Sequence, residues 1–483
     1  GYHLVGLPDS AIKESSYRIA AALKNNNYNL PGKKITINMA PADLRKEGSA
    51  YDLTLAIGIL AASGQIKPEE VGKYIIMGEM SLDGGLQPIR GALSIAIKAK
   101  EEGFTGIILP IQNVKEAAIV DGLEVYGVEN VLQVINFFEG KESLIPTVID
   151  TKEEFSKNLE FPEFDFADVK GQESIKRCME IAAAGGHNII LIGPPGAGKT
   201  MLAKRLPSIL PPMSMQEALE TTKIHSVTGR IKDAGLLTQR PFRAPHHTAS
   251  SVSLVGGGSY PQPGEISLAH NGVLFLDELP EFKREVLEVM RQPLEDREVT
   301  IARAKFTITY PSSFMLVASM NPSPSGFFID SKNSNGASQM EMQRYLSKIS
   351  GPLLDRIDIH IEVTPVPFEK LSETRKAESS VEIRKRVTKA RDIQTKRFEN
   401  YNHIHYNAQM SSKLIREYCD LDEVSLQLLK TAMERLNLSA RAYDRILKVS
   451  RTIADLENSE NVHSHHIAEA IQYRSLDREG WLG

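Results

Sequence analysis

Several features that would each mark a particular class of protein are scarce in this 483-residue sequence. The two cysteines, Cys178 and Cys419, lie far apart, which excludes an all-cysteine metal site and favours a reducing compartment. The longest apolar run, about Leu53 to Ala62, is too short to span a bilayer, so we expect no membrane association and a cytoplasmic location. The formal net charge of -4 gives no overall attraction to nucleic acid, and any such function must depend on local basic patches.

The chain is too long for one hydrophobic core, and its length predicts about three domains. Residues 144–165 contain prolines and acids without periodicity and are interpreted as a linker. We therefore place domains at 1–143 and 166–366, a connecting helical segment at 367–398 and a helical domain at 399–483. The sequence begins at Gly1 within a strand-like pattern, so we expect that further sequence precedes it.

Residues 188–206 have the order strand, glycine-rich loop and helix, which is the context that a phosphate-binding loop requires. The glycines let backbone N–H groups point inward, and the helix N-terminus adds positive potential for a phosphate. A plain Gly-Pro turn before a helix is the alternative. We assign nucleotide binding to the eight loop residues, Gly193, Pro194, Pro195, Gly196, Ala197, Gly198, Lys199 and Thr200.

Two further apolar stretches end in polar residues suited to ATP hydrolysis. Residues 272–276 precede Asp277, which with Thr200 would hold Mg²⁺, and Glu278, which would orient or deprotonate the attacking water. The strand from Phe314 ends at Asn321, where such enzymes sense the γ-phosphate. Arg356 lies between acids and is either an arginine finger for a neighbouring subunit or paired with Asp355 or Asp358 in its own chain.

Residues 221–264 are rich in glycine, proline and polar side chains, and we interpret them as a long functional loop or an insertion. Within this stretch, Arg243, His246 and His247 are candidates for contact with a polyanion or a neighbouring subunit. A metal is disfavoured because adjacent histidines point apart in a strand.

Residues 296–310 alternate in polarity and predict a β-hairpin with Arg303 and Lys305 near its tip. These two cations are candidate DNA contacts, with a solvated tip as the alternative. For the basic helical segment 379–398, DNA contact and a merely solvated face are likewise the two interpretations.

The first domain mixes strands, expected at 34–39, 74–78 and 106–109, with helices, expected at 10–25, 51–63, 91–102 and 111–120. Residues 41–53 and 77–91 resemble the proteolytic domain of Lon-type proteases. A gapless match places Ala50 and Leu93 where that family has its serine and lysine, so a serine–lysine mechanism is excluded. A shifted alignment could supply Ser49 but not the lysine.

Residues 166–172, including Val169 and Lys170, resemble in position the segment that cups adenine in AAA+ motors; an ordinary domain-entry turn is the alternative. Residues 411–476 predict a helical bundle with a break near Asn437. There Ser439 would cap a helix that carries Arg441 in its first turn. The histidines near the end of the bundle lie in a polar loop-to-helix junction and need no metal.

The chain resembles the ComM/YifB family, the magnesium-chelatase-like branch of AAA+ ATPases, over nearly its whole length. The resemblance is carried by the phosphate loop and by residues 240–247, 276–282, 318–322 and 353–358. It implies an α/β fold: an αβα three-layer P-loop core, preceded by an α+β Lon-protease-like domain of the ribosomal S5 domain 2 type and followed by an all-α lid.

By the same resemblance the protein is a homohexameric ring ATPase that uses ATP and Mg²⁺ and is not a protease. Arg356 acts across the subunit interface and Arg441 is the second sensor. The implied function is a DNA motor that binds single- and double-stranded DNA and migrates branches during DNA uptake, with protein partners for the Lon-like domain.

A chelatase-type motor that remodels a protein partner during metal insertion is the second hypothesis, and a nucleotide-gated scaffold is the third. Many relatives have cysteines after the sensor strand, whereas this chain has Ser323 and Ser325, so no zinc is expected.

Overall fold

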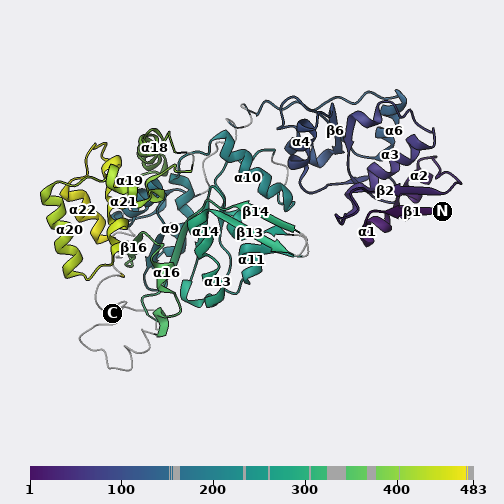
Figure 1. Cartoon of the computed structure of the whole chain (residues 1–483). Helices are drawn as coiled ribbons and strands as arrows, with labels where there is room; N and C mark the ends of the chain where they lie inside the picture. Colours follow the sequence, from purple (N-terminus) through teal and green to yellow (C-terminus); the bar gives the residue numbers. More distant parts are fainter. Residues whose placement is uncertain are drawn as a thin grey trace. The chain divides into compact units, whose positions relative to one another are not determined.

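The computed structural model describes the whole chain except residues 152, 154, 156–163, 232–234, 259–260, 304–305, 324–343, 367–376, 402, 475 and 477–483. The chain forms two compact units (Figure 1). The N-terminal unit comprises Gly1–Leu159 and Ser214–Thr238, and the C-terminal unit comprises Glu160–Met213 and Gln239–Gly483. None of the described helices combines the length and the apolar character that crossing a membrane requires.

The C-terminal unit is built on a five-stranded parallel sheet in the order β16-β8-β15-β12-β9. Its strands are β8 (Ile189–Ile192), β9 (Phe242–Arg243), β12 (Val273–Leu276), β15 (Met315–Met320) and β16 (Ile359–Glu362). The three central strands, β8, β15 and β12, are buried along their full length, as expected for a parallel sheet that is covered on both faces.

Alternate strand residues face two separate hydrophobic cores. Leu191 and Phe275 pack with α8 (Glu173–Gly185), α9 (Lys199–Arg205), α18 (Ser380–Arg397) and α21 (Ala440–Leu456). Ile192 and Leu276 pack with α12 (Glu265–Leu268), α13 (Arg284–Glu288), α16 (Gly351–Leu354) and one face of β13 (Glu298–Arg303). The predicted αβα three-layer core is therefore confirmed.

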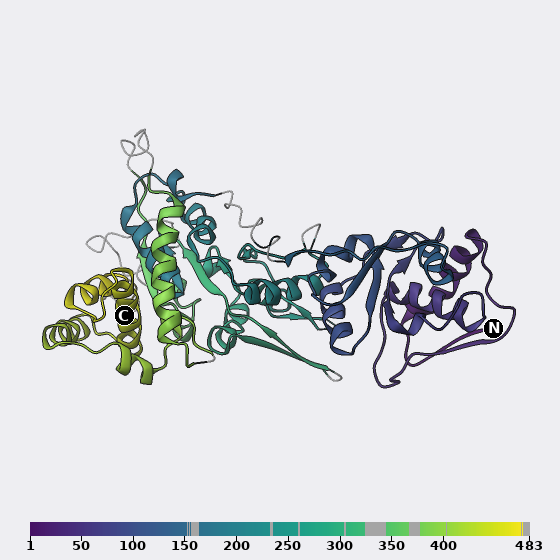
Figure 2. The same ribbon diagram turned by 90° about the horizontal axis from the view of Figure 1, so that it is seen from above.

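A β-hairpin of β13 and β14 (Phe306–Pro311) extends away from the sheet, as Figure 2 shows. Glu298 pairs with Pro311 and Arg303 pairs with Phe306, so the predicted hairpin is confirmed. Near it lie α11 (Ser251–Val255), the two-residue strands β10 (Gly256–Gly257) and β11 (Gln262–Pro263), and α14 (Arg291–Asp296).

The predicted helical bundle consists of α19 (Ser412–Tyr418), α20 (Glu423–Arg435), α21 and α22 (Ser464–Gln472). Asn437 breaks the chain with a left-handed φ of 48°, and the Ser439 side chain accepts a hydrogen bond from Ala442 N, as predicted for the cap of α21. At the centre of the bundle the fully buried Asp455 carboxylate accepts hydrogen bonds from Arg397 at 2.6 and 2.7 Å and from Asn407 at 2.8 Å.

The N-terminal unit contains a parallel three-stranded sheet, β3 (Tyr74–Ile76), β6 (Gly106–Pro110) and β7 (Glu124–Val128), and a parallel pair, β1 (Tyr2–Val5) and β2 (Ile35–Asn38). A short hairpin joins β4 (Glu79–Met80) to β5 (Leu86–Gln87). Its helices include α3 (Asp52–Ala62), α4 (Ala92–Glu101) and α6 (Val131–Glu139). The three predicted strands are confirmed, whereas β7 and α6 were not predicted.

Two predicted helices of this unit are interrupted. The helix expected at 10–25 begins after the Asp9 cap and is divided at Glu14 into α1 (Ser10–Lys13) and α2 (Ser15–Asn25). The helix expected at 111–120 is a 3-10 turn followed by the single turn α5 (Val114–Ala117).

The segment Ser214–Thr238 belongs to the N-terminal unit, although the predicted boundaries include it in the domain at 166–366. It contains α10 (Met215–Val227), which begins with a reciprocal capping box between Ser214 and Glu217. Gly91 N donates to Ser226 O at 3.0 Å at the start of α4. The prediction of a loop from residue 221 onward is therefore wrong over 221–227, because the capping signal lies before the stretch that was interpreted as a loop.

Two other predicted segments fall partly or mostly outside the described residues. Residues 146–150 of the linker have neither helix nor strand, and most of 151–163 is not described. The insertion after the sensor strand, which includes Ser325, is not described from residue 324 to residue 343.

Replacing Asp455 by alanine should destabilise the helical bundle by about 3–5 kcal/mol, because two guanidinium groups would lose their buried counter-ion. Urea unfolding followed by far-UV circular dichroism measures the change, with Glu434→Ala on the exposed face of α20 as the control. A loss below about 1 kcal/mol would contradict this role of the buried carboxylate.

Candidate nucleotide-binding site

The carboxyl ends of three neighbouring parallel strands bring the predicted hydrolytic residues together. Gly193 follows β8, Asn321 follows β15 and Asp277 follows β12, and these strands are adjacent in the sheet. Ligands bind at this edge in open parallel α/β sheets. The strand order therefore unites residues that are separated by up to 128 positions in the sequence.

Lys199 lies at the centre of this edge. Its ammonium Nζ donates to Gly193 O at 2.5 Å, to Pro194 O at 3.0 Å and to Asn321 Oδ1 at 3.1 Å. Burial lowers the pKa of Lys199, and the nearby carboxylates of Asp277 and Glu278 oppose that shift. The amine is thus held beside the sensor amide at the point where α9 begins.

The loop backbone adopts conformations that only glycine tolerates well. Gly196 and Gly198 have φ values of 79° and 91°. A Cβ on Gly193 would lie 2.3 Å from Val363 O, so the loop passes directly against the end of β16. These constraints explain the glycines of the motif in physical terms.

Thr200 and Asp277 form the candidate magnesium site. Thr200 Oγ1 donates to Asp277 Oδ2 at 2.9 Å, close to the spacing of about 3 Å between adjacent oxygens around an octahedral Mg²⁺. Ser319 Oγ and Glu278 N donate to the other Asp277 oxygen and fix the carboxylate. The donor set is made of the hard oxygens that Mg²⁺ prefers, so the residues fit the ion.

Ser319 lies within the motif at 318–322, but its role was not predicted from the sequence. The signal for it was a hydroxyl in an otherwise apolar buried strand, two residues before Asn321.

Glu278 has a left-handed φ of 53° and an exposed side chain, and its carboxylate lies 3.4 Å from His247 Nδ1. His247 follows β9, the strand beside β12, so it reaches the same edge of the sheet. Its ring lies 4.1 Å from that of His246. The expectation that these rings point apart is wrong, because the pair lies in a turn after β9 has ended and not within a strand.

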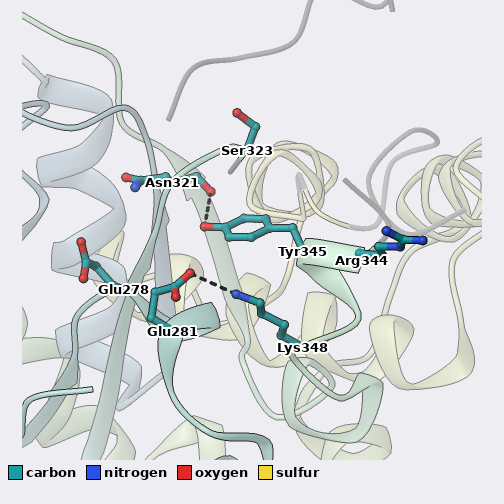
Figure 3. A pocket seen from close by; sticks show the side chains of 7 residues that line it. All are labelled: Glu278, Glu281, Asn321, Ser323, Arg344, Tyr345 and Lys348. Carbon is teal, nitrogen blue, oxygen red and sulfur yellow. Dashed lines mark hydrogen bonds and ion pairs between the residues drawn. The ribbon is translucent and has the colours of Figure 1, made fainter. Parts of the chain in front are cut away.

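A pocket of about 360 Å³ opens beside Glu278 and Asn321. Figure 3 shows the Tyr345 side chain pointing toward Asn321, where its hydroxyl donates to Asn321 O at 3.3 Å. Burial raises the pKa of Tyr345 to about 12, so the hydroxyl stays protonated as a donor. Lys348 Nζ pairs with Glu281 at 3.2 Å. These residues were not predicted, because only the folded chain brings 345–348 to the sensor strand.

Arg356 and Arg441 lie at the opposite edge of the sheet. Asn188, which precedes β8, donates from its side chain to Arg356 O at 2.9 Å, and β8 adds about 13 Å before Gly193 is reached. Arg441 pairs with Asp355. Neither arginine contacts the phosphate loop within the described residues of its own chain.

The ion pair predicted for Arg356 within its own chain is wrong about the acidic partner. Its guanidinium pairs with Glu295, not with Asp355 or Asp358. Asp358 is buried and bonds to Arg445 at 3.0 Å and to His187 Nδ1 at 3.2 Å, which holds the pKa of Asp358 well below its usual range.

The remaining predicted contacts are distributed over several elements. Val169 is buried and Lys170 half-buried in the segment that leads to α8, and Gln172 of that segment donates to Ala197 O at 3.1 Å. Arg243 is paired with Glu265 at 2.6 Å. Arg303 is exposed at the end of β13 and donates to Gly258 O at 3.3 Å, while Lys305 lies outside the described residues.

The cations of α18 are partly engaged within the chain. Arg386 bonds to Glu180 and Glu378, and Arg391 donates to Ala183 O and Ala184 O. This arrangement favours the structural interpretation of the basic segment over DNA contact.

One group in the described residues has the spacing of metal ligands: Glu457, His465 and His466. His466 Nδ1 accepts from His463 N at 2.8 Å, which leaves the proton of the neutral ring on Nε2, facing Glu457 at 3.2 Å. This is the geometry of a hydrogen-bonded helix start.

In the N-terminal unit, the positions that match the Lon serine and lysine are apolar. Ala50 is partly buried in the core beside α4, and Leu93 is fully buried. Ser49 Oγ donates to Glu79 and not to an amine.

Known proteins and family profiles match nearly the whole chain. Three family profiles match: "Magnesium chelatase, subunit ChlI" over residues 165–371, "Subunit ChlI of Mg-chelatase" over 1–113 and "Magnesium chelatase, subunit ChlI C-terminal" over 377–474. The competence protein ComM of Haemophilus influenzae is 45% identical over 480 residues, which cover 99% of this chain and 92% of that protein. The chain belongs to the magnesium-chelatase-like ComM/YifB family.

The YifB protein of Escherichia coli is 44% identical over 480 residues, with the same coverage. Lon protease 2 of Bacillus subtilis is 28% identical over 149 residues, 29% of this chain and 27% of that protein. Membership of the ComM/YifB family implies an AAA+ ATPase that uses ATP and Mg²⁺.

Replacing Lys199 by alanine should lower ATP hydrolysis by about 100-fold or more, because the ammonium that contacts the sensor amide and would bind the phosphates is lost. Phosphate release measures this, with Lys204→Ala on the exposed face of the same helix as the control. Hydrolysis within about threefold of the unmodified chain would show that the loop does not carry the activity.

Proposed function

We propose that this protein is an ATP-driven ring motor that acts on DNA and remodels branched recombination intermediates. The observation that carries the proposal is the division of charged residues between the two edges of one sheet. The hydrolytic residues lie at the carboxyl edge, and Arg356 and Arg441 lie at the amino edge. A site divided in this way is completed by a neighbouring subunit, and the similarity to a competence protein supports DNA as the substrate.

Within one subunit, the residues of the carboxyl edge have separate tasks. The loop amides and Lys199 bind the phosphates, and Thr200 and Asp277 hold Mg²⁺, which neutralises phosphate charge. Glu278 accepts a proton from the attacking water, and Asn321 orients it beside the γ-phosphate. Tyr345 is a positioning residue that acts through the Asn321 backbone.

In a closed ring, a neighbouring subunit supplies the positive charge that the nucleotide site lacks within its own chain. In a closed homohexamer the amino edge of one subunit faces the carboxyl edge of the next, so Arg356 and Arg441 neutralise the transition state of the neighbouring site. Arg356 would exchange Glu295 for the phosphate, and Arg441 would exchange Asp355. Asp355 holds the exposed Arg441 side chain at the surface in advance, whereas the Arg356 side chain beside Glu295 is only 13% exposed.

The hairpin is the element best placed to contact DNA. It extends away from the sheet and carries Arg303 in an exposed position, with Lys305 beyond it in the sequence. Arg243 and His247 are engaged with Glu265 and Glu278, so they link this region to the hydrolytic site and are weaker candidates for phosphate contact. The N-terminal unit acts without proteolysis, because Ala50 and Leu93 supply neither a nucleophile nor a base.

A chelatase-type motor that remodels a protein partner is the second candidate. Its support is the description of the three matched families, each named for a subunit of magnesium chelatase. The two functions differ in their response to DNA, since a protein-remodelling motor has no reason to hydrolyse ATP faster on a branched duplex.

Phosphate release should rise when branched DNA is added to the unmodified chain, and the rise should fall steeply with salt as counterion release requires. Glu278→Gln should lower hydrolysis by about 100-fold with or without DNA, because the general base is lost. Glu285→Gln, an exposed acid on α13, is the matched control. Equal turnover with and without branched DNA would contradict the DNA motor and favour the chelatase-type function.

A further inference from the structure

The strand β2 in the N-terminal unit has an open edge. Among the described residues it pairs only with β1, and Ile35 N and Met39 N donate to Gly1 O and Val5 O on that side. Because backbone groups alternate along a strand, the N–H and C=O groups of Thr36 and Asn38 point to the other side. No hydrogen bond to these groups is found within the described part of the chain.

This open edge forms one wall of a cavity of about 740 Å³. The other wall is α3, where Leu55 and Ile59 form an apolar floor. Gly58 lies between them, and a Cβ on it would meet no atom within 4 Å. The groove therefore combines an apolar floor with a row of main-chain donors and acceptors, which is the arrangement used to bind extended peptides by strand addition.

The charged side chains that line the groove are all positive. Its lining includes Lys33 and Lys34 at the start of β2 and contains no acidic residue. Both lysines are exposed, and neither has an ion pair among the described residues. An occupant with carboxylates at its end would complement this charge.

We propose that this groove binds an extended acidic peptide segment of a partner protein, which adds as a strand to β2. The strand edge and apolar floor recognise a peptide backbone with alternating apolar side chains, whereas a nucleic acid would use only the two lysines. None of the residues assigned to nucleotide or DNA lines the groove. The site thus gives the N-terminal unit a recruiting function that is independent of ATP hydrolysis.

The test uses fluorescence anisotropy of the full chain with a labelled peptide, Glu-Glu-Val-Thr-Val-Thr-Val-Glu. The unmodified chain should bind it, and the same peptide with alternate N-methylated amides should bind at least about tenfold more weakly, because it cannot form the ladder. Gly58→Leu, which fills the groove, should weaken binding at least about tenfold, whereas Gly58→Ala should change it less than about threefold. A peptide with lysine in place of glutamate should also bind at least about tenfold more weakly.

Equal binding of the peptide and its N-methylated form would overturn the proposal, because that pair of probes needs no protein variant to fold. Equal affinity of the unmodified chain and a folded Gly58→Leu variant would also overturn it. Displacement of the peptide by an eight-nucleotide single strand would show a nucleic-acid surface instead, and no binding up to about 1 mM peptide would show that the groove is not a peptide site.

Discussion

The parallel pairing of β16 and β15 with β8 determines which candidate site residues lie together in one chain. In a parallel sheet, the residues that come after the strands share one edge, and the residues that precede the strands share the other. Lys199 and Asn321 meet at the first edge, whereas Arg356 lies at the second. The proposed hydrolytic residues and the proposed arginine finger therefore lie at two different edges of the sheet. Within one chain, the length of β8 separates Arg356 from the phosphate loop.

The nucleotide site was predictable from the sequence because each part is a local pattern. A buried strand followed by Gly193 and its loop, or by Asp277 and Glu278, is recognisable within about ten residues. These patterns come together because the strands that precede them are parallel neighbours in one sheet. The distance between Thr200 and Asp277 and the bonds of Lys199 agree with this prediction in position, although the catalytic roles themselves remain predictions.

The parts that were not predicted depend on contacts distant in sequence. Tyr345 reaches the sensor strand only through the fold, and His247 reaches Glu278 because a two-residue strand adds beside β12. The segment around α10 packs in the N-terminal unit, and no local signal in its sequence indicates this. Arg356 was predicted as a candidate finger, but its actual partner, Glu295, lies 61 positions away. Local patterns therefore predicted which candidate residues meet at the carboxyl edge, but not the groups that hold them in place.

The most direct measurement of the divided site is phosphate release from a mixture of two inactive variants, Lys199→Ala and Arg356→Ala, with oligomer size checked by light scattering. Each variant keeps the part that the other has lost. If neighbouring subunits share the site, an equal mixture regains about a quarter of the unmodified activity, since random assembly restores one interface in four. If the mixture is no more active than the average of the two variants alone, each chain completes its own site and the account is wrong.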